Sequence, residues 1–361
     1  MIYILRKVCV SMSLKKSLLA LATACLCMTG AASFAAQPQI NAESAYVLDA
    51  GSGAELYAKN ADQHMNPGGT AMMMTAILGV ESGKLDTVMT VGDAAQNLPG
   101  DVSRLGLYPG DKVTLRNALT GMMTVGGCDA AMDVAANVSS STASFVQAMN
   151  DKAAAIGATN THFSNPTGLP DSNTYSTAKD LAKIAAYGMR SADFRGLVNH
   201  TSFDMPYATS GSIHCETTND FLRSGFAGAN GVKTGATNAG GPALVASATR
   251  NGHTLIASIL NSSSRSADAQ ALLKYGFDRL ASGNVKAATT ATSATSATAK
   301  AASTPVRESA SAQTVAADAE AYTLRQAPAG QTLTDVKEKQ QQAAQLTTQA
   351  KTAAATAAAA K

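Results

Sequence analysis

The sequence predicts an α+β domain in which one antiparallel sheet is flanked by helices. Three observations lead to this prediction. Residues 44–49 form a strand pattern at the start of the globular part of the chain, and apolar stretches of helical type fill its middle. Near its end, Asn251-Gly252 separates two apolar runs, which is a strong hairpin signal. Strands at both ends with helices between them favour pairing of the terminal segments in one sheet.

The first predicted elements are a strand pair and a buried helix. The strand at 44–49 is followed by a turn at Gly51-Ser52-Gly53, and the chain returns as a second strand at 54–58. The stretch 71–80 is apolar without interruption and ends near Gly83. An apolar run of this length predicts a buried helix.

Later patterns complete the predicted domain. A second apolar helical region, 115–136, is interrupted by Gly126-Gly127. The segment from Thr177 to Asp180 has the form of a capping box, which predicts a helix start. The runs on either side of Asn251-Gly252 are the two hairpin strands, and an apolar stripe over 269–280 predicts the last helix.

The N-terminal 35 residues have the organisation of a secretory signal peptide. Lys15-Lys16 form a basic region, 17–28 form an apolar run, and small residues lead to a cleavage motif at Ser33-Phe34-Ala35. Met12 is an alternative start, because the shorter leader has a cleaner basic region. We therefore expect the mature chain to be secreted across the cytoplasmic membrane, into the periplasm or the cell wall.

Composition separates the remaining chain into a globular domain, 36–284, and a tail, 285–361. The tail is mostly Ala, Thr, Ser and Gln, so we expect it to be largely disordered, with a terminal helix as an option over 334–361. That segment lacks an apolar stripe, so we expect no strong membrane anchor. The formal net charge of the whole chain is +3, and the basic residues of the leader account for it. No broad nucleic-acid surface is indicated.

The most specific motif is Lys233-Thr234-Gly235, just before the hairpin. It places a cation and a hydroxyl on one strand, and the glycine lets a ligand approach the backbone. Other motifs precede it along the chain in this order: Cys128-Asp129-Ala130-Ala131, Phe145 with Met149-Asn150, Phe163 to Pro170, Ser176 to Ala182, and Thr218-Asn219. Over residues 42 to 283 this set resembles the penicillin-binding D-alanyl-D-alanine carboxypeptidases, serine peptidases of the bacterial cell wall.

The resemblance implies a β-lactamase/transpeptidase-like fold with a helical subdomain, and three catalytic motifs. In S-x-x-K, the serine attacks the peptide carbonyl and the lysine takes its proton. The matching frame, Pro67 to Thr75, has Gly69 at the serine position and Met72 at the lysine position. The S-x-N motif reads Gly126-Gly127-Cys128. Only the third motif, Lys233-Thr234-Gly235, is intact.

These replacements predict a homologue with no catalytic residue at the family positions. Lys233, Thr234 and Gly235 are the expected substrate-binding residues, and the expected ligand is a peptidoglycan stem peptide or a β-lactam, held weakly and without a covalent bond. We expect neither a cofactor nor a metal. Two alternatives stay open: an active carboxypeptidase in peptidoglycan remodelling that uses a rerouted mechanism, and a non-catalytic envelope protein that binds a partner.

Several side chains near these motifs are candidates for other roles. Thr70 adjoins the lost serine, but one helical step turns its side chain away by about 100°. Cys128 is a better nucleophile if a neighbour lowers the pKa of its thiol. Its pairing with Cys215 is open. His64 is expected to be a surface residue, and Met72-Met73-Met74 to be core packing and not a metal site.

Overall fold

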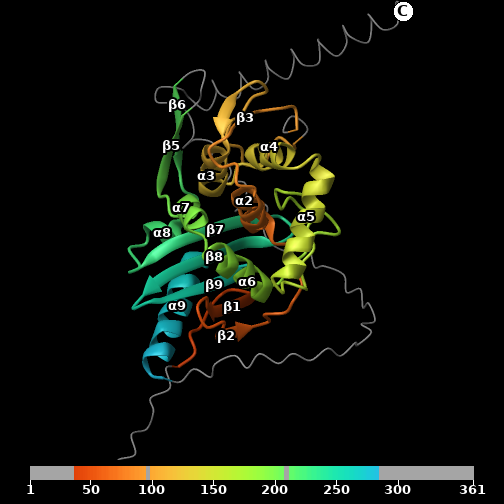
Figure 1. The fold of residues 1–361 in the computed structure, drawn as a ribbon. Helices are drawn as coiled ribbons and strands as arrows, with labels where there is room; N and C mark the ends of the chain where they lie inside the picture. Colours follow the sequence, from red (N-terminus) through yellow and green to blue (C-terminus); the bar gives the residue numbers. More distant parts are fainter. Residues whose placement is uncertain (1–35, 95–97, 207–210, 284–361) are drawn as a thin grey trace, which may run out of the picture.

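The computed structural model describes residues 36–94, 98–206 and 211–283. The expectations for the leader, for the tail and for the terminal helix lie outside the described residues. Five strands form one antiparallel sheet in the order β2-β1-β9-β8-β7. Their bounds are β1 Ser44–Asp49, β2 Glu55–Lys59, β7 Ala229–Thr237, β8 Gly241–Arg250 and β9 His253–Leu260. The N-terminal β1 pairs with the late β9, so the predicted pairing of the terminal segments is confirmed (Figure 1).

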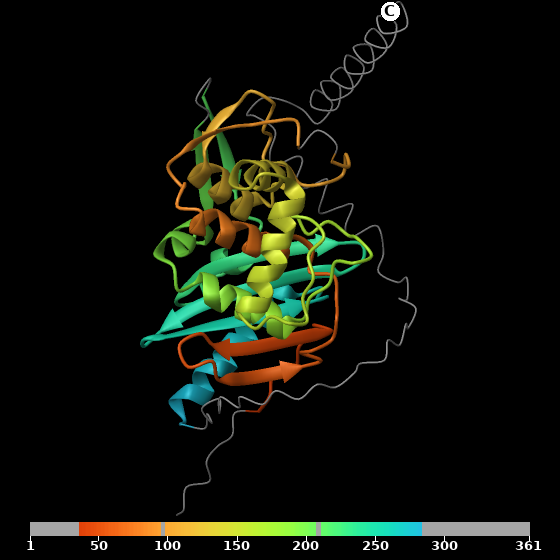
Figure 2. The same ribbon diagram turned by 45° about the vertical axis from the view of Figure 1, so that its right-hand side comes forward.

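Both faces of this sheet are covered. The last helix, α9 (Arg265–Ala281), packs on one face, and α6 (Ala178–Gly188) packs on the other (Figures 1 and 2). Side chains of β1 alternate between two apolar cores, since Val47 lies in the core under α9 whereas Tyr46 and Leu48 lie in the other core. This period of two is the natural consequence of strand geometry, and it explains why every residue of β1 is buried.

A helical subdomain sits beside the sheet and surrounds α2 (Figure 1). The helix α2, Met72–Glu81, follows the short 3-10 helix η1, Gly68–Ala71, and is apolar on nearly every side. A helix of this kind must be buried. The elements around it are α3 Leu115–Val125, α4 Cys128–Val138, α5 Thr142–Ala155, α6 and α7 Ala192–Val198. The prediction of a buried helix over 71–80 is confirmed.

The predicted helical region 115–136 is divided into α3 and α4. Gly126 ends α3 in the left-handed conformation with a φ of 81°, and its N–H donates to the carbonyl of Met122. Glycine adopts this conformation without steric penalty. The hairpin prediction is also confirmed, because Asn251 and Gly252 both have positive φ and join β8 to β9.

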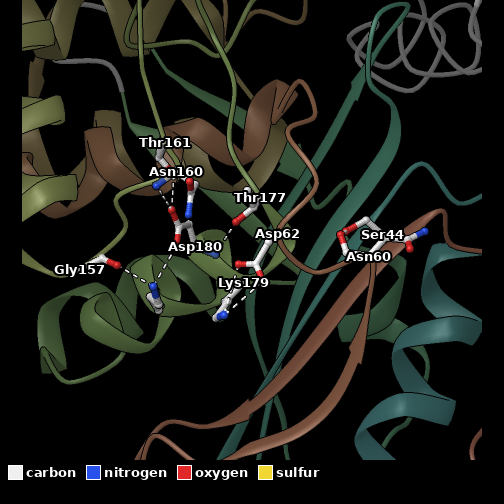
Figure 3. Close-up of polar contacts among 10 residues, drawn as sticks. Ser44, Asn60, Asp62, Gly157, Asn160, Thr161, Thr177, Lys179 and Asp180 are labelled. Carbon is white, nitrogen blue, oxygen red and sulfur yellow. Dashed lines mark hydrogen bonds and ion pairs between the residues drawn. The ribbon is translucent and has the colours of Figure 1, made fainter. Parts of the chain in front are cut away.

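The start of α6 follows the capping prediction in part (Figure 3). The hydroxyl of Thr177 accepts the N–H of Asp180, at 3.1 Å. The Asp180 carboxylate does not reach back to the cap residue; it accepts the N–H of Asn160 at 2.7 Å and pairs with Lys183 at 3.0 Å. Asp180 therefore ties the loop before α6 to the helix. Its side chain is shorter than the Glu or Gln of a capping box, and its carboxylate is already bound to Asn160 and Lys183, so the box is not completed.

The remaining elements are a small helix and two short hairpins that the sequence patterns do not indicate. They are α8 Asp220–Arg223, the pair β3 Val88–Thr90 and β4 Lys112–Thr114, and the pair β5 Ser202–Pro206 and β6 Ser212–Glu216. Across the three described ranges, no helix is long and apolar enough to cross a membrane.

Candidate functional site

The segments that correspond to the three motifs meet on β7. A Cβ atom at Gly69 would lie 3.2 Å from the carbonyl oxygen of Thr234. A Cβ atom at Gly126 would lie 3.4 Å from the Nζ atom of Lys233. The start of the η1 segment and the α3–α4 turn thus both face the Lys233-Thr234-Gly235 strand, which the motif order alone cannot establish.

The η1 segment is held against β7 by close backbone packing. A Cβ atom at Gly235 would lie 2.9 Å from the nitrogen of Gly69, and one at Gly168 would lie 1.9 Å from the carbonyl oxygen of Gly68. No side chain fits at these distances, so only glycine allows the approach. The Asn66 carboxamide adds two links, because its oxygen accepts the N–H of Gly68 at 3.0 Å and the hydroxyl of Thr237 at 3.2 Å.

Neither Thr70 nor Met72, which follow Gly69 in the chain, offers a reactive group. Thr70 is fully buried, and its hydroxyl donates to the carbonyl of Pro67 at 2.6 Å. Met72 is only 1% exposed. It lies with Met73 and Met74 in the apolar core around α2. The three methionines therefore act as core residues, as the sequence indicates.

Cys128 begins α4 and is buried. Burial raises the pKa of its thiol to about 12, and the neighbouring Asp129 carboxylate adds to this, while Lys233 acts in the opposite direction. The thiol is consequently protonated at neutral pH, and a protonated thiol is a poor nucleophile. Cys215, on β6, is buried too, and burial raises the pKa of its thiol to about 11. Both cysteines are free, which answers the open question of their pairing.

Lys233 is a buried cation. Its side chain is 2% exposed, and its Nζ donates to the carbonyl of Thr234 at 3.0 Å. Burial lowers the pKa of this amine to about 8, helped by the nearby Arg265 guanidinium. Within the described ranges no carboxylate pairs with it. The hydroxyl of Thr234 shares a hydrogen bond of 2.6 Å with Thr218, so the motif strand is well ordered by its neighbours.

A loop that the sequence motifs miss also reaches this site. The Asp129 carboxylate accepts the N–H groups of Leu105 and Gly106 at 2.7 Å and of Leu107 at 3.0 Å. The N–H of Cys128 donates to the carbonyl of Ser103 at 2.8 Å. These bonds place the Ser103 hydroxyl 3.8 Å from the position of a Gly126 Cβ. A single serine in a loop carries no sequence signal for this.

His64 lies apart from these residues, on an exposed loop. Its ring stacks on that of Tyr175 at a centroid distance of 4.4 Å. This is the surface position that the sequence indicates. No group of three or more His, Cys, Asp or Glu side chains in the described part of the chain is arranged to hold a metal ion.

Comparisons with known proteins agree on one family. A model described as D-alanyl-D-alanine carboxypeptidase matches residues 31–264. The D-alanyl-D-alanine carboxypeptidase of Streptomyces sp. strain K15 is 36% identical over 259 residues, covering 67% of this chain and 89% of that protein. For DacA of Haemophilus influenzae the identity is 32%, over 66% of this chain and 63% of the relative, so this chain spans less than two thirds of that protein.

Solved structures show the same likeness. The crystal structure of the Streptomyces K15 DD-transpeptidase superposes with a TM-score of 0.64 at 35% identity, covering 68% of this chain and all of the other. The α+β fold, with an antiparallel sheet and a helical subdomain, is therefore the penicillin-binding fold that the sequence motifs predict.

Proposed function

The chain belongs to the D-alanyl-D-alanine carboxypeptidase family, and we propose that it is a non-catalytic member that binds its ligand without acylation. The observation that carries this proposal is the pair Gly69 and Met72 at the nucleophile and base positions of the family frame. Glycine has no side chain, and methionine has no proton to exchange. Loss of such a nucleophile costs on the order of 10⁶ in turnover.

The surroundings support the proposal, because neither Thr70 nor Cys128, the two candidate nucleophiles that the sequence indicates, is suited to replace the serine. The Thr70 hydroxyl is buried and committed to a backbone carbonyl. The Cys128 thiol has a raised pKa. Solved variants of the Streptomyces K15 enzyme replace a serine and, two positions later, a cysteine. The same spacing separates Gly126 from Cys128, so we attribute the loss in this motif to Gly126 and not to the cysteine.

Ligand binding is the function that the remaining groups support. We propose Lys233, Thr234 and Gly235 as binding residues for the carboxylate of a stem peptide or of a β-lactam. A buried ammonium without an anionic partner is costly, and a ligand carboxylate would relieve this cost. We also propose that residues 1–35 direct secretion to the periplasm or cell wall, and that 36–284 form the binding domain.

Labelling with fluorescent penicillin tests the absence of acylation. We expect no labelled band after boiling in detergent, and no release of D-alanine from a peptide that ends in D-Ala-D-Ala. The Streptomyces K15 enzyme, assayed in parallel, serves as the positive control. A band that survives boiling would overturn the proposal, and mapping of the label to Cys128 would identify the rerouted mechanism.

Reversible binding needs a second measurement. We expect equilibrium dialysis with the same peptide to detect binding that Lys233→Met abolishes. If neither peptide nor purified peptidoglycan is retained by the unmodified chain, the binding function is wrong, and a protein partner in the envelope becomes the better explanation.

A further inference from the structure

The Lys233 ammonium has unused hydrogen-bonding capacity. An ammonium group has three donors, and only the bond to the Thr234 carbonyl is formed within residues 36–94, 98–206 and 211–283. The charged side chain that acts on it most strongly is Arg265, which is also a cation. A buried cation in this setting is stabilised by an anion. The site therefore has the electrostatic character of a receptor for one small anion.

The place where that anion fits is the bare backbone of Gly126. A Cβ atom at Gly126 would lie 3.4 Å from the Lys233 Nζ and 3.8 Å from the Ser103 Oγ. Gly126 and Ser103 are both partly exposed, so this position borders the surface, whereas Lys233 is buried. Because Gly126 has no side chain, two polar groups from different segments face the same unoccupied side-chain position.

Ser103 is fixed in place before any ligand arrives. Its carbonyl accepts the N–H of Cys128 at 2.8 Å, and its hydroxyl donates to the carbonyl of Val125 at 3.0 Å. Two residues further on, Asp129 anchors the chain through the N–H of Leu105. The Ser103 oxygen is therefore held in position before a ligand binds, and only the hydroxyl hydrogen has to change its acceptor.

We propose that Ser103 is a ligand-binding residue, whose hydroxyl binds one carboxylate together with the Lys233 ammonium across the position of the missing Gly126 side chain. Since the Lys233 Nζ and the Ser103 Oγ lie 3.4 Å and 3.8 Å from the same Cβ position, they are at most about 7 Å apart. A carboxylate can bridge a gap of up to this width with a hydrogen bond of about 2.8 Å at each end. On binding, the hydroxyl hydrogen turns from the Val125 carbonyl to the carboxylate, which is the stronger, charged acceptor.

This inference deepens the proposed function and rests on it for the identity of the natural ligand, but the anion site can be tested by itself. The probe is acetate, with acetamide as the uncharged analogue, and binding is followed through the backbone amide resonances of Gly126 and Gly235. We expect saturable binding of acetate and none of acetamide. Ser103→Ala should weaken acetate binding about tenfold, in line with the loss of a hydrogen bond to a charged group.

Matched variants separate binding from folding. Ser140→Ala removes a serine hydroxyl beyond the far end of α4, and we expect it to leave acetate binding unchanged. Ser103→Thr keeps the hydroxyl and should keep binding. If Ser103→Ala is poorly folded, Ser103→Gly provides the second loss variant. In a Lys233→Met background, Ser103→Ala should have no further effect on acetate binding, because the two groups bind the same anion.

The outcomes distinguish this inference from the function on which it rests. Acetate affinity that is equal in Ser103→Ala and the unmodified chain would overturn the role of Ser103, even if the D-Ala-D-Ala peptide binds. Absence of acetate binding in the unmodified chain would also overturn it. Acetate binding that depends on Ser103, together with failure of the peptide to bind, would support the anion site and refute the proposed natural ligand.

Discussion

Restoring the lost groups should restore acylation by penicillin, at a cost in stability that the structure allows us to estimate. The perturbation is the triple substitution Gly69→Ser, Met72→Lys and Gly126→Ser. We expect this variant to form a covalent penicillin adduct, and each single substitution to form none. Nucleophile, base and proton-shuttling hydroxyl act as a unit, and the effects of such groups are strongly non-additive.

Each substitution has its own structural cost. A Cβ atom at Gly69 would lie 3.2 Å from the Thr234 carbonyl, so this contact must open by a few tenths of an ångström. Gly126 has a φ of 81°, a conformation that costs other residues about 1–2 kcal/mol. Met72 is 1% exposed, and a lysine there loses hydration. With a similar cost of about 1–2 kcal/mol for each of the other two substitutions, the total is about 3–6 kcal/mol, against a typical unfolding free energy of about 5–15 kcal/mol.

The assay has two readouts. Fluorescent penicillin followed by peptide mapping should locate the label at position 69, and thermal unfolding should show a midpoint about 10–20 °C below that of the unmodified chain. The double variant Met72→Lys, Gly126→Ser lacks the nucleophile and is the control. A triple variant that is folded and stays unreactive would contradict this prediction, because the geometry at Gly69 and Gly126 would then be unable to support the reaction.

Two further predictions concern the scaffold. Gly168→Ala should destabilise the domain severely, because its Cβ would lie 1.9 Å from the Gly68 carbonyl oxygen. The control is Gly157→Ala, which has a similar φ of 79° and open space around it, and which should cost only about 1–2 kcal/mol of unfolding free energy. Equal losses in urea unfolding would contradict this prediction. Burial raises the pKa of Asp133 to about 6 from its ordinary 3.8, so the folded state holds this proton more tightly than the unfolded state does. The unfolding free energy should therefore fall as pH rises from about 4 to 6, by at most about 3 kcal/mol. Asp133→Asn should remove that fall in unfolding curves recorded across this range, and an unchanged pH profile would count against it.

The sheet was predictable because its signals are local and strong. Asn251-Gly252 dictates a tight hairpin, and the alternation in β1 reflects burial on two faces. The strand pairs β3–β4 and β5–β6 could not be predicted from the sequence, because their strands are short and mostly exposed. Such strands carry little apolar periodicity, and their pairing is decided by tertiary contacts.

The residues of the site could be predicted from the sequence, but their burial and their hydrogen-bond partners could not. The resemblance to the carboxypeptidase family implied that Gly69, Gly126 and Lys233 belong to one site, and the structure brings these residues together. The raised pKa of the Cys128 thiol depends on burial, which no local pattern reports. Ser103 reaches the site through hydrogen bonds to the start of α4, and a lone loop serine looks like any other in a sequence.

A lysine at position 72 and a serine at position 126, the residues that the family motifs require, would each cost stability in this structure. A lysine at position 72 would add a second buried cation, because α2 packs against β7, which carries Lys233. A serine at position 126 would strain a left-handed turn. If the chain is the non-catalytic member proposed above, Met72 and Gly126 avoid both costs, as expected where stability and activity trade against each other. Lys233 does not follow this trend, since it remains buried and unpaired in the described structure. The ligand carboxylate that we propose for this site would balance the charge of this lysine.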